Sequence, residues 1–283
     1  MIQKQPVIGI IGGRGKTGSW FARFFKANGY QVLIADQHTK LTSEKLIARS
    51  DVVIFSLPID ITPEVIRELA PLAKPEQLWM DFTSIKTPAV NAMLRSQAEV
   101  IGCHPMFGPM VDSIVEQTVI VCPVRVKRWK GWWERLLKAN KATVKISTPA
   151  EHDRMMAIVQ GLTHFSAITI AHTLRELGVD IPASLSFTSP VYKIHLDMEG
   201  RILAQDPGLY AAIQVLNPET REVLHTHLQS VSKLFQTVEQ RDLAAFIDYF
   251  QKAAEYLGDF KEQALAESND LIKALVERQD KTT

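Results

Sequence analysis

Two short segments carry side chains that are able to take part in acid–base chemistry. The segment WMDFTSIK places Ser84 and Lys86 just past an apolar run, and VIGCHPMFGP places His104 at the end of the next run. A histidine, with an ordinary pKa of about 6.5, suits a general base that takes a hydroxyl proton while a hydride leaves the same carbon. Ser84 can orient that ring or bind the same hydroxyl, and Lys86 is a candidate cation for a substrate carboxylate. A purely structural histidine is the alternative for His104.

Two other combinations of reactive residues are poorer candidates. Cys103 precedes His104, but adjacent residues of a strand point to opposite faces, which predicts a buried, unreactive thiol rather than a Cys–His nucleophile. His225 and His227 lack the further ligands that a metal site needs. We therefore expect chemistry without a metal.

The segment VIGIIGGRGKTGSW fits a dinucleotide-binding turn better than a P-loop. The P-loop pattern G-x-x-x-x-G-K-[ST] would need a glycine at position 10, which is Ile10. Gly13, Gly15 and Gly18 form G-x-G-x-x-G directly after an apolar run, where a helix N-terminus can bind the pyrophosphate. A glycine-rich turn without a ligand is the alternative.

A carboxylate at the expected distance strengthens the dinucleotide interpretation. Asp36 stands eighteen residues after the last glycine of the motif, at the end of the second apolar run. A carboxylate there accepts hydrogen bonds from the adenine ribose and repels a 2′-phosphate, which favours NAD over NADP. Lys16 and Thr17 open the first helix and are candidate cofactor contacts, although Lys16 can equally be solvated. His38 and Lys40 could receive a 2′-phosphate, so the preference is not absolute.

A polar stripe is expected on the helix that begins near residue 149. Asp153, Gln160 and His164 are seven and four residues apart, so at 100° per residue they share one face of an otherwise apolar helix. The stripe either lines a pocket that faces the nicotinamide or bonds internally to other helices.

Arg201 is a further candidate with two interpretations. A guanidinium can bind a substrate carboxylate through two parallel hydrogen bonds. However, Lys193, Asp197 and Arg201 also form an i,i+4 ladder typical of a solvated helix face, and the residues alone favour this second interpretation.

The elements that must position these residues change in kind near residue 147. The first part alternates helical patterns with strands rich in Val and Ile, which predicts a mostly parallel, Rossmann-like α/β sheet over residues 1–147. Thr148 as N-cap, Pro149 and Glu151 then start an all-α domain over residues 148–283. The expected strands are 6–11, 31–36, 51–57, 77–82, 99–104, 118–123 and 142–147. The expected helices include 151–178, 183–205, 207–216, 218–236 and 240–278, with a kink or break at Pro190.

Composition excludes several classes of protein. Lys and Arg total 32 against 31 Asp and Glu, a balance that gives no reason to expect nucleic acid or an anionic membrane as partner. Two cysteines are too few for a disulfide framework, and the N-terminus lacks a signal peptide, so we expect a cytoplasmic protein. Apolar helices in the second half favour a homodimer.

Together these motifs resemble a known enzyme family. The segments GGRGKTG, DFTSIK, GCHPMFGP, EHDRMMAIVQGLTHF and GRILAQDPGLY are similar, in this order, to those of prephenate dehydrogenases, notably the dehydrogenase part of bifunctional chorismate mutase–prephenate dehydrogenases. No mutase segment precedes the first strand, so mutase activity is not expected.

The resemblance implies NAD-dependent oxidative decarboxylation of prephenate to 4-hydroxyphenylpyruvate, in tyrosine biosynthesis, by a dimer. It implies that His104 is the catalytic base, assisted by Ser84. It further implies that His164 lines the substrate pocket and that Arg201 binds a substrate carboxylate, which reverses the preference for a solvated ladder.

Three other functions remain open. Arogenate or an amino-substituted prephenate differs from prephenate at one group, which one sequence does not resolve. A β-hydroxyacid dehydrogenase would use a central lysine, and the HPMFG strand end argues against it. A non-catalytic NAD-sensing module would leave Ser84, His104 and Arg201 without a role.

Overall fold

The computed structural model describes the backbone of residues 5–280 and the side chains of residues 5–277. By compactness the chain divides into a first unit, Met1–Gln160 with Gly208–Glu219, and a second unit, Gly161–Pro207 with Thr220–Thr283. Secondary structure changes from mixed to helical between residues 146 and 149, whereas the first compact unit extends to residue 160 and includes residues 208–219. The helix that follows the sheet, Pro149–Met156, belongs to the first unit because it packs against Thr87–Met93, a helix that covers one face of the sheet.

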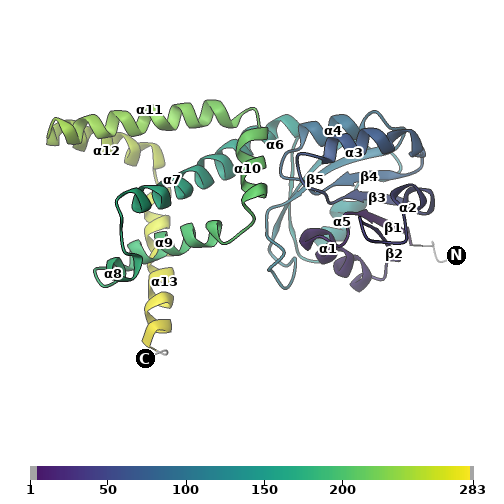
Figure 1. Cartoon of the computed structure of the whole chain (residues 1–283), viewed down its shortest axis with the longest axis horizontal. Helices are drawn as coiled ribbons and strands as arrows, with labels where there is room; N and C mark the ends of the chain where they lie inside the picture. The colour runs from purple at the N-terminus through teal and green to yellow at the C-terminus, as the bar shows by residue number, and fades with distance from the viewer. Residues whose placement is uncertain (1–4, 281–283) are drawn as a thin grey trace. The chain divides into compact units, whose positions relative to one another are not determined.

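The first unit contains a seven-stranded sheet in the order β2-β1-β3-β4-β5-β6-β7 (Figure 1). All neighbouring strands are parallel except β5 and β6, so the expected mostly parallel sheet is confirmed. Each of the seven predicted strands is present. They are Ile8–Ile11 (β1), Val32–Ala35 (β2), Val52–Phe55 (β3), Leu78–Asp81 (β4), Glu99–Pro105 (β5), Thr118–Arg125 (β6) and Thr143–Ile146 (β7).

Helices cover both faces of this sheet and give it two apolar cores. On one face α1 (Lys16–Ala27) and α5 (Trp132–Ala139) bury an aromatic cluster that includes Phe21, Phe25 and Trp133. On the other face α2 (Ser43–Arg49), α3 (Thr62–Leu69) and α4 (Thr87–Met93) cover Val53, Phe55 and Trp79. Burial on both faces explains why the strands are almost continuously apolar in sequence.

The chain continues from the sheet through a helix that changes its winding. The helix α6 (Pro149–Met156) begins as predicted, because Thr148 Oγ1 accepts the Glu151 N–H and Pro149 occupies the first turn. The segment Ala157–Leu162 is then a π-helical turn, and α7 (Thr163–Glu176) resumes the α-helix. The expected uninterrupted helix is therefore wrong in this turn.

The remaining helices confirm one expectation and correct another. The predicted break at Pro190 is confirmed, since α8 (Ile181–Leu185) ends before it and α9 (Pro190–Leu203) starts on it. The expected single helix over 240–278 is wrong because Gly258, with φ +53° and ψ −135°, separates α12 (Leu243–Leu257) from α13 (Phe260–Asp280). The two helices between these pairs are α10 (Pro207–Leu216) and α11 (Thr220–Glu239). None of the helices in residues 5–280 is long and apolar enough to cross a membrane.

Candidate active site

The candidate base lies where β4 and β5 end at one edge of the sheet. Asp81 is the last residue of β4 and pairs with Gly102 of β5, so His104 lies two residues further along β5. Because the two strands are parallel, both side chains reach the carboxyl edge, where ligands bind in open α/β sheets. His104 is only 3% exposed. Cys103 is also buried and accepts a hydrogen bond from Trp133 on the opposite face, as predicted.

Lys86 makes a buried ion pair beneath this edge instead of an open cationic site. Its ammonium bonds to Asp81 and donates to the carbonyl oxygen of Cys103 at 2.7 Å, and both charged side chains have no exposed surface. Gly102 makes room for the lysine, because a Cβ there would lie 3.2 Å from Lys86 Cδ. The expected contact of Lys86 with a substrate carboxylate is at odds with this burial, since its donors are turned inward.

His104 is hydrogen bonded to a second histidine that the motif analysis did not assign. Its Nδ1 lies 2.9 Å from Nε2 of His152, and Nδ1 of His152 lies 2.8 Å from Oδ1 of Asp153. His152 is 1% exposed and Asp153 3% exposed. Two imidazoles and a carboxylate thus form one buried chain of hydrogen bonds.

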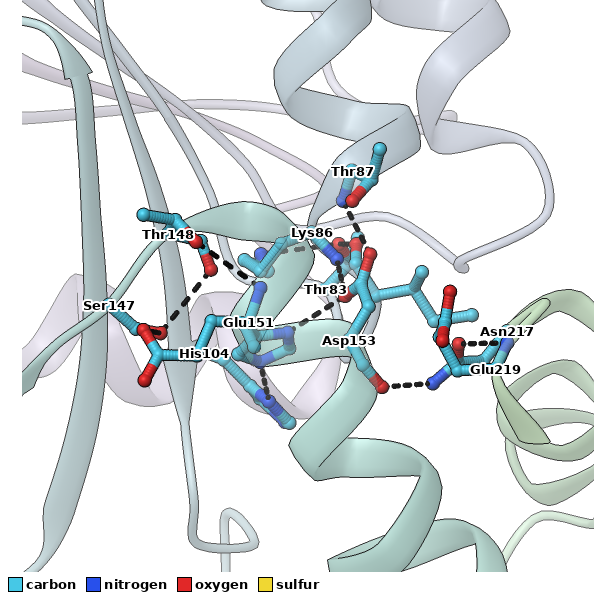
Figure 2. A network of polar contacts seen from close by, with 12 residues as sticks. Thr83, Lys86, Thr87, His104, Ser147, Thr148, Glu151, Asp153, Asn217 and Glu219 are labelled. Atoms are coloured by element: carbon cyan, nitrogen blue, oxygen red, sulfur yellow. Dashed lines mark hydrogen bonds and ion pairs between the residues drawn. The ribbon is translucent and has the colours of Figure 1, made fainter. Parts of the chain in front are cut away.

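Two backbone N–H groups at the start of α4 and the side chain of Asn217 hold Asp153 in place (Figure 2). Its Oδ1 accepts the Lys86 N–H at 2.7 Å and its Oδ2 accepts the Thr87 N–H at 2.9 Å, at the first turn of α4. Its own carbonyl oxygen accepts from Asn217 Nδ2 at 2.8 Å. For Asp153, internal bonding is therefore the correct interpretation of the polar stripe. The π-helical turn Ala157–Leu162, which contains Gln160, interrupts the regular α-helical spacing between Asp153 and His164.

The electrostatics of this chain favour neutral imidazoles and an ionised carboxylate. Burial, followed by the neighbouring His152 and Lys86, holds the pKa of His104 well below its usual value. Burial also lowers the pKa of His152, although Asp153 opposes that shift. Burial alone would raise the pKa of Asp153, but hydrogen bonds from His152, Lys86 and Thr87 outweigh it and lower that pKa. The His104 ring is therefore neutral near neutral pH, with one nitrogen that can accept a proton.

The glycine-rich turn has the shape that a dinucleotide phosphate requires. Gly12 has φ +79°, and a Cβ on Gly18 would lie 2.4 Å from the Gly12 carbonyl oxygen, so the turn tolerates only glycine at these two positions. Gly15 is the N-cap of α1, no side chain caps this helix, and its first turn, which includes Lys16 and Thr17, contains no acidic residue. The first N–H groups of the helix are therefore left for an anion.

The predicted ribose-binding carboxylate lies beside this turn. Oδ2 of Asp36 accepts the Arg14 N–H at 2.9 Å, and Oδ1 accepts the Gln37 N–H at 2.8 Å. The structure thus brings Asp36 together with the loop that contains Gly13 and Gly15. These residues fit a dinucleotide at the carboxyl edge of β1 and β2.

The substrate-binding and catalytic roles of the other candidate residues stay predictions. Ser84 is half-buried in the loop between β4 and α4, and Gln160 is half-buried in the π-helical turn with its Oε1 buried. His164 on α7 and Arg201 on α9 belong to the second unit, in which these two helices pack together. The Lys193–Asp197 part of the expected ladder is confirmed, and Arg201 is exposed.

The sequence contains one signal that could have identified His152. It precedes Asp153 in the segment EHD, and a histidine beside a carboxylate is a common way to set a tautomer. Helical periodicity at 100° per residue instead predicts a polar stripe of Asp153, Gln160 and His164, which leaves His152 out. Only the packing of α6 against the end of β5 brings His152 to His104.

Comparisons with known proteins agree with this geometry. Residues 24–146 match the prephenate dehydrogenase nucleotide-binding domain, and residues 148–252 match the prephenate dehydrogenase dimerization domain. A crystal structure of prephenate dehydrogenase from A. aeolicus, with hydroxyphenyl propionate and NAD+, shares the fold at a TM-score of 0.72 and 18% identity. That match covers 92% of this chain and 100% of the other.

Two relatives are more similar in sequence. The probable arogenate/prephenate dehydrogenase of Methanocaldococcus jannaschii is 35% identical over 97% of this chain and 66% of its own length. The T-protein of Haemophilus influenzae is 35% identical over 93% of this chain and 70% of its own length. This chain thus spans about two thirds of the relatives that it matches. The chain belongs to the prephenate dehydrogenase family.

Proposed function

We propose that this protein catalyses the NAD-dependent oxidative decarboxylation of prephenate to 4-hydroxyphenylpyruvate, a step of tyrosine biosynthesis. The observation that carries the proposal is His104, a neutral imidazole at the carboxyl edge of the sheet whose Nδ1 is engaged by His152. Its other nitrogen is then the one available to a substrate hydroxyl. The family assignment supplies the class of substrate.

The proposed reaction needs a base and a hydride acceptor. His104 takes the proton of the ring hydroxyl while the carbon that carries it loses a hydride. The ring carboxylate leaves as carbon dioxide, its bonding electrons complete the aromatic ring, and the resulting phenolate oxygen takes the proton back from His104. NAD, when bound at the glycine-rich turn, supplies the hydride acceptor.

Several residues have proposed supporting roles in substrate binding. Ser84 assists His104 at the hydroxyl, Gln160 and His164 line the pocket, and Arg201 binds one carboxylate. The Asp36 carboxylate beside the turn favours NAD, because it would repel a 2′-phosphate.

We further propose that the protein is a cytoplasmic homodimer. The match of residues 148–252 to a dimerization domain supports the dimer. Both cysteines of the chain are free and buried, which suits a reducing compartment.

The test is NADH formation by purified protein with prephenate and, separately, with arogenate, each offered with NAD and with NADP. Fast reduction of NAD with prephenate is the expected result. Turnover with arogenate alone would keep the chemistry and change the substrate, and the name of the M. jannaschii relative includes both acids. Tight NAD binding without turnover of either acid would instead favour the NAD-sensing module.

A further inference from the structure

We propose that His152 and Asp153 are positioning residues that fix the tautomer of His104 and share the proton that it takes from the substrate. The sharing of a substrate proton rests on the proposed function. The tautomer itself does not, because the contacts within the first unit determine it.

The hydrogen bonds allow only one arrangement of protons. An ionised carboxylate is an acceptor only, so Nδ1 of His152 must carry the proton that points to Asp153 Oδ1 at 2.8 Å. Nε2 of a neutral His152 is then an acceptor, and Nδ1 of His104, 2.9 Å away, must donate to it. The unprotonated nitrogen of His104 is therefore Nε2.

The Asp153 carboxylate, at the end of this series of hydrogen bonds, is itself held in place. Three donors point at Asp153, namely the His152 ring and the backbone N–H groups of Lys86 and Thr87. The Asn217 side chain binds its carbonyl oxygen as well. A base held in this way loses little orientational freedom when the substrate binds.

The charges around the two rings favour uptake of one proton. Asp81 and Lys86 form an ion pair, and the Asp153 carboxylate adds one negative charge. The other titratable groups near this cluster are the buried thiols of Cys103 and Cys122, whose pKa values burial raises, and Glu151, which is bound to Ser147. With both imidazoles neutral the buried cluster carries a formal charge of −1, and the proton taken by His104 neutralises it.

The hydrogen-bonded chain His104–His152–Asp153, which we call the relay, connects the negative charge of Asp153 to His104. A buried imidazolium is costly unless an anion compensates it. Asp153 contacts His152 and not His104, so the negative charge acts on His104 through the intervening ring. When His104 accepts a proton at Nε2, its Nδ1–H bond to His152 strengthens and part of the positive charge moves toward Asp153.

The first test measures the tautomers without any substrate. Long-range 1H–15N spectra of protein labelled in histidine should show, at pH 7, protons on Nδ1 of both His104 and His152 and none on their Nε2 atoms. Protonation of His104 at Nε2, or a doubly protonated His152, would overturn the proposal. This result does not depend on prephenate turnover, so it is separate from a failure of the proposed function.

The second test uses His152→Gln and Asp153→Asn with the substrate that the wild type turns over. Each should lower kcat on the order of 100-fold, with KM changed by no more than about threefold, because general-base catalysis contributes to the transition state. The acid limb of the kcat profile should move to lower pH, since an imidazolium without its partner is less stable. His172→Gln, which replaces an exposed histidine on α7, is the matched control.

A structural role alone predicts a different outcome. If His152 and Asp153 only stabilise the fold, the variants should lose thermal stability and leave the acid limb in place, which would overturn the relay. Should a variant fail to fold, the tautomer measurement on the wild-type protein still decides the question.

Discussion

The two compact units bury their apolar side chains to very different extents. In the first unit Phe21, Trp79 and Trp133 are completely buried, whereas in the second Phe187 and Tyr256 are each 90% exposed. The second unit leaves many more large apolar side chains exposed than the first, and a contiguous patch of such side chains usually marks an interaction surface. The first unit has two buried apolar cores, while most of the residues that match the dimerization domain of the family lie in the second unit.

The candidate catalytic groups are divided in the same way. The base, its partner histidine and their carboxylate belong entirely to the first unit, together with the glycine-rich turn. His164 and Arg201, which we propose for substrate binding, belong to the second unit. Changes in the first unit should therefore affect chemistry and folding, and changes in the second should affect assembly and substrate affinity.

The largest effect should come from His104→Asn. Loss of the base should lower kcat on the order of 10⁴-fold, or several kcal/mol of transition-state stabilisation, while NAD binding is retained. NADH formation and a separate NAD titration measure the two quantities. Near-normal turnover would remove His104 from the mechanism.

Lys86→Met should destabilise the first unit by about 3 kcal/mol or more, because it leaves the Asp81 carboxylate buried without its partner. Urea unfolding followed by tryptophan fluorescence measures this loss. The double variant Lys86→Met, Asp81→Asn should recover much of it, since no uncompensated charge remains. Equal losses in the single and double variants would contradict the buried ion-pair interpretation.

Phe250→Glu tests the apolar surface of the second unit. Phe250 is 66% exposed on α12, and a carboxylate there should weaken a dimer by about 2 kcal/mol or more if the ring is central to the interface. Sedimentation equilibrium measures the dissociation constant. The control is Gln251→Glu, which adds the same charge at the neighbouring exposed position. An unchanged dissociation constant for Phe250→Glu would place the interface elsewhere.

The smallest effect concerns Glu99, at the start of β5. Its carboxylate accepts the backbone N–H groups of Lys127, Arg128 and Trp129 at 2.6 to 3.0 Å. Burial alone would raise the pKa of Glu99, but these three bonds outweigh it and the pKa is lowered. Glu99→Gln should therefore cost on the order of 1 to 2 kcal/mol of unfolding free energy at pH 7.

Because the pKa of Glu99 is lowered in the folded protein, the loss of unfolding free energy in Glu99→Gln should depend on pH. A carboxyl with a lowered folded-state pKa contributes stability above its unfolded pKa, near 4.3, and loses it as the pH falls through the folded value. The difference between wild type and Glu99→Gln should shrink below about pH 4 in urea titrations. Glu68→Gln, at an exposed position of α3, is the charge-matched control. A difference that stays constant down to pH 3 would rule out the proposed carboxylate contribution.

Local patterns predicted most of the first unit. Short apolar runs, most of them rich in Val and Ile, predict all seven strands, and the aromatic residues Trp20, Phe21, Phe24 and Phe25 lie on the buried face of α1. Such patterns succeed because burial on both faces of a sheet constrains every residue of a strand. In the second half periodicity was less informative, since neither the π-helical turn at residues 157–162 nor the break at Gly258 interrupts the apolar pattern.

Spacing along the chain is enough to predict the dinucleotide turn, the carboxylate at Asp36 and the position of His104 at a strand end. These features depend on spacing within about thirty residues, which the local chain geometry preserves. The burial of Lys86 against Asp81 and the position of His152 between His104 and Asp153 depend on tertiary packing. Lys86 and Asp81 are only five positions apart, but His104 and His152 are 48 apart, and the Lys86 N–H that binds Asp153 is 67 positions from it. No local pattern encodes which buried polar groups meet across the longer separations.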